Sequence, residues 1–212
     1  MQVSAEIRWF WRNSPPHEIE AWFRGNEYNP FLAGGGPPAR TDKYLYEPGQ
    51  AEIGLKIRGN NPLGIEVKGM VSESVGHLSA RPFSGPIEIW TKWTATTLDL
   101  GSRPLIVTHK TRWLRKFDTT TASPIEIELS QEEKPVNGRP LPERGCNTEL
   151  THIELPQKRE SWWSLGFESF GTIASVEMDL RAVAGILANR KPPKFTGDII
   201  SSYPRWLNNS RF

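Results

Sequence analysis

Polar and apolar residues alternate with a period of two along most of this chain. The clearest stretch spans residues 51–68, where two alternating runs are joined by a Gly-Asn-Asn-Pro turn. The alternating positions are Ile53, Leu55 and Ile57 with Lys56 and Arg58, then Ile65 and Val67 with Glu66 and Lys68. Alternation bounded by Gly, Asn and Pro predicts a β-hairpin with one apolar and one charged face.

The same pattern predicts strands in the rest of the chain. They cover residues 3–11, 42–46, 86–94, 104–117, 124–129 and 148–155. In the first strand one face carries Ser4, Glu6, Arg8 and Phe10, and the other carries Ala5, Ile7, Trp9 and Trp11. The stretch 70–84 is less regular, and the aromatic stretch 161–170 is ambiguous.

Helical patterns are few. Ser14 as N-cap and Pro15 as first helical residue predict a short helix that ends near Arg24. A longer apolar stripe predicts a helix over 175–189, which the Pro192-Pro193 pair ends. The polar stretches 26–40 and 130–146 are expected to be loops. The strands are expected to form a barrel, and the tail 190–212 is expected to pack on it.

Composition limits the class of protein. The chain has 212 residues with no Gly- or Ser-rich linker, which favours one domain over 1–212. A net charge of +2 gives no reason to expect nucleic acid or an anionic membrane as a partner. The single Cys146 excludes an internal disulfide, and we find neither a secretory leader nor a run of roughly 20 apolar residues. A cytoplasmic protein is therefore expected, as a monomer or homodimer.

The charged faces of the strands allow two interpretations. The charges alternate in pairs, namely Glu6 and Arg8, Lys56 and Arg58, Glu66 and Lys68, Glu88 and Lys92, Lys110 and Arg112, Glu126 and Glu128, and His152 and Glu154. One interpretation is the solvated face of a β-sandwich interaction module. The other is the lumen of a barrel, because basic and acidic pairs separate onto different strands and Trp90 lies among the charges. The low mean hydropathy of −0.51 with only 37% hydrophobic residues also fits a polar interior.

Inward charges would form a site for a polyanion. Lys and Arg would bind phosphate oxygens, and Mg²⁺ or Mn²⁺ would bridge the ligand to glutamates. Phosphoryl transfer needs mainly positioning and neutralisation of charge, with a metal to polarise phosphorus or activate water.

The ordered motifs resemble those of the triphosphate tunnel metalloenzyme (CYTH) superfamily over about residues 3–188. Ser4-Ala-Glu6-Ile-Arg8 falls on the family's opening Glu-x-Glu-x-Lys, and Lys56-Ile-Arg58 on its Arg-x-Arg. Further matches are Asp42-Lys-Tyr-Leu45, Glu66-Val-Lys68, Lys110-Thr-Arg112, Glu126-Ile-Glu128, His152-Ile-Glu154 and Leu165-Gly-Phe-Glu168. The resemblance implies an eight-stranded antiparallel tunnel, with a short N-terminal helix and a C-terminal helix outside it.

The resemblance also implies a metal-dependent phosphohydrolase that acts on inorganic, nucleotide or organic triphosphate. The residues expected to bind this phosphorylated small molecule are Arg8, Lys56, Arg58, Lys68, Lys92, Lys110 and Arg112. Glu6 and Glu128 are expected to be catalytic, and the metal ligands would be Glu126, Glu128 and Glu154.

The chain departs from the family pattern at four positions. Ser4 replaces the first glutamate, Arg8 a lysine, Glu66 a threonine and His152 a carboxylate. Losing a carboxylate lowers affinity for Mg²⁺, whose ligands are oxygens. The alternative is therefore a catalytically degenerate tunnel that binds a phosphorylated ligand or partner.

Overall fold

The structure is a computed structural model, and it describes residues 1–25, 39–59, 64–130, 132–136, 138 and 140–209. Most of the expected loop 26–40 and the turn between the two runs of the first hairpin lie outside the described residues.

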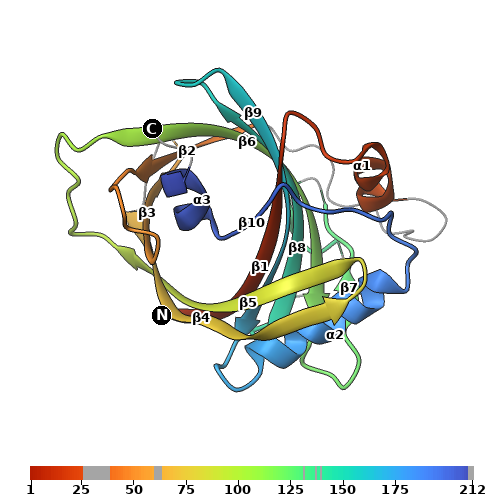
Figure 1. Cartoon of the computed structure of the whole chain (residues 1–212). Coiled ribbons are helices and arrows are strands. Elements are labelled where there is room, and N and C mark those ends of the chain that lie inside the picture. Colours follow the sequence, from red (N-terminus) through yellow and green to blue (C-terminus); the bar gives the residue numbers. More distant parts are fainter. Residues whose placement is uncertain (26–38, 60–63, 131, 137, 139, 210–212) are drawn as a thin grey trace.

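Eight antiparallel strands close into a barrel, which confirms the expected fold class (Figure 1). The strand order around the barrel is β1-β5-β4-β3-β2-β6-β8-β9, and β9 pairs with β1 to close it. The bounds are β1 (Gln2–Arg12), β2 (Arg40–Leu45), β3 (Ile53–Arg58), β4 (Ile65–Ala80), β5 (Phe83–Ala95), β6 (Leu105–Asp118), β8 (Gly145–Leu155) and β9 (Glu160–Gly171). Two short strands lie outside it: β7 (Ile125–Ile127) pairs with β6, and β10 (Ile199–Ile200) pairs with β1.

Two helices pack on the outside of the barrel. They are α1 (His17–Arg24) and α2 (Val176–Ala188). The N-cap of α1 is Pro16, not the expected Ser14. A residue followed by proline is disfavoured in the helical region, so Pro15 cannot begin the helix. Among the described helices, none is long and apolar enough to cross a membrane.

The main hydrophobic core lies between the barrel wall and these helices. The outward face of β1 contributes Ala5, Ile7, Trp9 and Trp11, as the alternation predicts, and α2 contributes Leu180, Val183 and Leu187. Burial of apolar area stabilises a fold by about 25 cal/mol per Å². Because this core is outside the barrel, the barrel interior is free to be polar.

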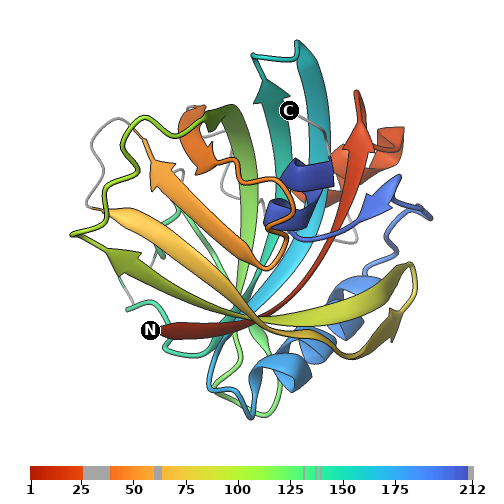
Figure 2. The same ribbon diagram turned by 60° about the vertical axis from the view of Figure 1, so that its left-hand side comes forward.

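The third helix, α3 (Tyr203–Asn209), lies within the ring of strands (Figures 1 and 2). Its Trp206 is fully buried and stacks on Phe10, with ring centres 4.6 Å apart. Ile106, Ile153 and Leu155 complete this apolar cluster from the same end of the barrel. Helix α3 therefore fills one end of the lumen, whereas α1 and α2 pack on the outer wall of the barrel.

Candidate functional site

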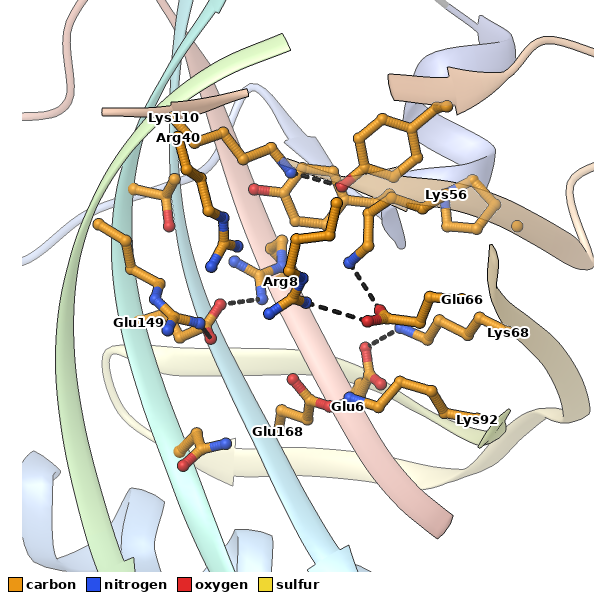
Figure 3. A pocket seen from close by; sticks show the side chains of 18 residues that line it. Glu6, Arg8, Arg40, Lys56, Glu66, Lys68, Lys92, Lys110, Glu149 and Glu168 are labelled. Carbon is orange, nitrogen blue, oxygen red and sulfur yellow. Dashed lines mark hydrogen bonds and ion pairs between the residues drawn. The ribbon is translucent and has the colours of Figure 1, made fainter. Parts of the chain in front are cut away.

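A cavity of about 210 Å³ lies in the lumen next to α3 (Figure 3). Every strand of the barrel contributes at least one charged side chain to its lining. These are Glu6 and Arg8 of β1, Arg40 of β2, Lys56 and Arg58 of β3, Glu66 and Lys68 of β4, Lys92 of β5, Lys110 and Arg112 of β6, Glu149 of β8 and Glu168 of β9. The alternating charges on these strands thus turn inward, which rules out the β-sandwich with a solvated charged face.

The structure brings together all of the residues that the sequence predicted to bind phosphate. Arg8, Lys56, Arg58, Lys68, Lys92, Lys110 and Arg112 line the cavity, together with the predicted catalytic Glu6. Arg40 adds a further cation, which makes eight cationic side chains against four carboxylates in the lining. Among the described residues, Asp42 and Glu133 are not in the lining but pair with its Lys110 and Arg112, so the excess of positive charge around the cavity is smaller than the lining alone gives.

Glu149 connects two arginines on neighbouring sides of the cavity. Its Oε2 lies 3.1 Å from Arg8 Nη2 and its Oε1 lies 2.7 Å from Arg112 Nη1. Burial alone would raise the pKa of Glu149, but Arg112 and Arg8 outweigh it and hold the pKa well below its usual value. The carboxylate is thus ionised and satisfied by cations.

The other lumen carboxylates are also paired with cations. Lys68 donates to Glu6, and Lys92 Nζ lies 3.1 Å from Glu168 Oε1. Glu66 Oε1 lies 2.6 Å from Lys56 Nζ, and Glu66 Oε2 lies 3.1 Å from Arg58 Nη2. Each lumen carboxylate thus holds at least one lysine or arginine in place, as the dashed lines at Glu6, Glu66 and Glu149 in Figure 3 illustrate.

Lys110 lies in the most enclosed part of the site. Its ammonium group donates to Tyr44 Oη at 2.6 Å and lies 3.6 Å from Asp42 Oδ2, and its residue is 3% exposed. Burial lowers the pKa of Lys110 to about 7, and Arg40 and Arg8 act in the same direction against Asp42. Burial and the neighbouring Arg58 likewise lower the pKa of Lys56 to about 8. A bound anion would favour the charged forms of both lysines and so raise their pKa values.

Three carboxylates that were expected in the lumen lie outside it. Glu126 is buried between Arg115, at 2.6 Å, and Arg190, and it belongs to β7, which is not part of the barrel wall. Glu128 and Glu154 are exposed and do not line the cavity. The expected lumen position of these three proposed metal ligands is therefore wrong.

On β8 the face that was predicted to point into the lumen, with His152 and Glu154, points outward. Residues 147, 149 and 151 line the cavity, whereas His152 contacts Ser161 and Trp163 on the outer side. Leu150 packs in the outer core and Ile153 packs in the inner apolar cluster near α3. Apolar residues thus occur on both faces of this strand, so the alternation does not determine the inward face.

The cavity lining also includes Arg40, Tyr44, Glu149, Glu168 and Tyr203, which were not among the predicted site residues. A signal existed for the first two, because residues 40, 42 and 44 alternate on one face of β2. Tyr203 had no such signal, because α3 reaches the lumen only through the tertiary fold.

Three lumen carboxylates on adjacent strands are the candidates for a divalent-metal site. Glu88, Glu6 and Glu168 form a row, because Glu6 is the register partner of both other residues on adjacent strands. Their oxygens suit Mg²⁺, but Trp90 and Arg205 donate to Glu88, and lysines pair with the other two. Among the described residues no group of three or more His, Cys, Asp or Glu is arranged to hold a metal ion. As arranged, these carboxylates are engaged by lysine, arginine and tryptophan side chains, so a metal ion would have to displace those partners.

A scan against protein-family models and a search of curated proteins found no match to this chain.

Proposed function

We propose that this protein binds a small molecule carrying several phosphate groups, such as a triphosphate, in the lumen of its barrel. The observation that carries the proposal is the convergence of eight lysine and arginine side chains, from the walls of one barrel, on one cavity. Phosphate oxygens accept charge-assisted hydrogen bonds from such groups, and arginine can bind them in a bidentate manner.

Phosphate groups of the ligand would replace the glutamate carboxylates as partners of the lysine and arginine side chains. Arg112, for example, pairs with Glu149 at 2.7 Å and is only 16% exposed, so its guanidinium group is already oriented and partly desolvated. Preorganised partners reduce the entropy lost on binding. A cavity of about 210 Å³ is below the roughly 300–1,000 Å³ that encloses drug-sized ligands, so the enclosed part of the ligand is compact.

Hydrolysis of the same ligand with Mg²⁺ or Mn²⁺ is a second candidate function. It is favoured by the register pair Glu6 and Glu168, which places two oxygen ligands side by side in the lumen. Mg²⁺ is commonly bound by one or two carboxylates together with substrate phosphates. Both carboxylates would first have to exchange their lysine partners, so this candidate ranks below binding alone.

Thermal unfolding and calorimetry with inorganic triphosphate test the binding proposal. Near 100 times Kd the ligand should stabilise the protein by about 2.7 kcal/mol. Lys56→Ala and Arg112→Ala should reduce this stabilisation, whereas Lys43→Ala, on the exposed outer side of β2, should leave it unchanged. If triphosphate does not stabilise the wild-type protein, or if the lumen variants respond like Lys43→Ala, the proposal is wrong.

Phosphate release separates the two candidates. Triphosphate is incubated with protein and Mg²⁺ or Mn²⁺, and Glu6→Gln serves as the lumen variant with Glu128→Gln as the matched outer control. Release that Glu6→Gln abolishes and Glu128→Gln retains would favour hydrolysis. Binding without release would leave the tunnel as a binding site.

A further inference from the structure

A second cavity lies outside the barrel, on the other side of β1 from the lumen. It has a volume of about 810 Å³ and is bounded by the turn between β4 and β5, the end of α2 and the segment 191–197. This volume is within the range of cavities that enclose drug-sized ligands. The cavity shares no lining residue with the charged site in the lumen.

The floor of this outer cavity is apolar and aromatic. The apolar lining residues are Trp9, Pro82, Ala188, Pro192, Phe195 and Ile200. The indole N–H of Trp9 donates to the carbonyl oxygen of Ser84 at 3.2 Å, so its polar atom is satisfied, and the ring is 2% exposed beneath the other lining residues. The Phe195 ring meets that of Trp9 edge to face at 5.6 Å.

The wall formed by 191–197 is fixed to the barrel. Trp11 Nε1 donates to the carbonyl oxygen of Thr196 at 2.8 Å, and a Cβ atom added to Gly197 would lie 3.0 Å from Trp9 Cβ. The segment therefore packs directly on β1, and the cavity exists without a ligand to form it.

The charged residues that line this cavity are all basic. They are Arg81, Lys191 and Lys194, and no Asp or Glu occurs among the described lining residues. Asp198, the nearest acidic residue along the chain, instead accepts from the backbone N–H of Arg12 at 2.9 Å. An apolar floor with cations and no carboxylate is complementary to a ligand that has an apolar body and one anionic end.

We propose that this outer cavity binds a small amphipathic anion, namely an aromatic or aliphatic body with a single carboxylate, sulfonate or phosphate group. The apolar body would lie against Phe195 and Ile200, above the buried Trp9 ring, and the anionic end would face Arg81 and Lys194. This site would differ from the lumen in its ligand, because the lumen combines a smaller cavity with many cations and suits a compact polyanion.

A pair of matched dyes tests the proposal. Anilinonaphthalene sulfonate is anionic, and phenylnaphthylamine has the same aromatic body without the sulfonate; both fluoresce in apolar surroundings. The wild-type protein should bind the anionic dye at one site and the neutral dye more weakly. Combined Arg81→Glu and Lys194→Glu should weaken binding of the anionic dye about tenfold and leave the neutral dye unchanged. Lys43→Glu, an exposed lysine on β2, is the matched charge control and should change neither.

Filling the cavity gives an independent readout. Ser84 lines it and is exposed, so Ser84→Phe should fold normally and weaken both dyes. The proposal is wrong if the wild-type protein does not bind the anionic dye at one site, or if the charge reversals leave its affinity unchanged. It is also wrong if triphosphate displaces the dye and Arg112→Ala removes it, because the dye would then occupy the lumen.

Discussion

The ammonium group of Lys110 lies 3.8 Å from the centre of the Tyr203 ring. Lys110 belongs to β6 and Tyr203 to α3, so the helix that fills the end of the barrel also forms part of the surroundings of a lumen cation. Tyr203 also lies 4.8 Å from the guanidinium carbon of Arg8. The C-terminal helix is therefore part of the charged site as well as its closure.

Affinity for triphosphate should fall as the pH rises from about 7 to about 9. The pKa of Lys110 is lowered to about 7 and that of Lys56 to about 8, whereas a bound anion favours the charged form of each. Below about pH 7 both lysines are charged before binding, so they add no pH dependence. Above it, binding must take up a proton, and affinity falls by up to tenfold per pH unit for each lysine. Calorimetry in buffers of different ionisation enthalpy measures the uptake.

Lys110→Arg is the control for titration of the ligand itself. Arginine keeps its charge over this pH range. The affinity of the variant for triphosphate should therefore not fall near pH 7, whereas any pH dependence from titration of triphosphate itself should remain. Identical pH profiles for the wild-type protein and the variant would contradict a role for Lys110.

Glu149→Gln should destabilise the protein without ligand by about 3 kcal/mol. The substitution keeps the shape of the side chain but leaves the buried Arg8 without its ion-pair partner Glu149. Triphosphate should restore part of the loss, because phosphate oxygens replace the carboxylate. Urea unfolding with and without triphosphate measures both effects. Glu154→Gln, on the exposed face of the same strand, should stay within about 0.5 kcal/mol of the wild-type protein.

Trp206→Ala should lower the free energy of unfolding by about 3–5 kcal/mol, as is usual for a buried tryptophan. Trp206 is fully buried between Phe10 and Trp162, and its loss would leave a void at the end of the lumen. Trp93→Ala is the matched control, since Trp93 is 42% exposed and should cost far less. Equal losses in guanidinium unfolding would show that α3 does not contribute to the stability of the barrel.

Glu126→Gln should destabilise the protein by about 3 kcal/mol and leave triphosphate affinity unchanged. Glu126 is 3% exposed and pairs with Arg115 and Arg190 outside the lumen, so its role is structural. Glu128→Gln, at an exposed position, should affect neither quantity. A loss of affinity in Glu126→Gln, measured by calorimetry with Mg²⁺ present, would instead support its earlier assignment as a metal ligand.

Alternation was most informative where one face of a strand is uniformly apolar. In β1, Trp9 and Trp11 mark the outer face, so the inward position of Glu6 and Arg8 follows from the sequence. In β7 the same alternation was misleading, because a strand of three residues outside the barrel presents no face to the lumen.

The sequence by itself determined most of the segments that become strands, though not β9 or the second half of β4, and which charged residues share a face on β1, β3, β4 and β6, because a strand places alternate side chains on opposite sides. Only the tertiary structure decided that Glu149 and Glu168, and not Glu126 and Glu154, complete the lumen. The inward face of a strand depends on its register in the closed barrel and on where the apolar core lies. Here one apolar cluster lies outside the barrel wall and another lies inside the barrel at the α3 end. Hydrophobicity alone therefore could not distinguish the inward face of a strand from its outward face.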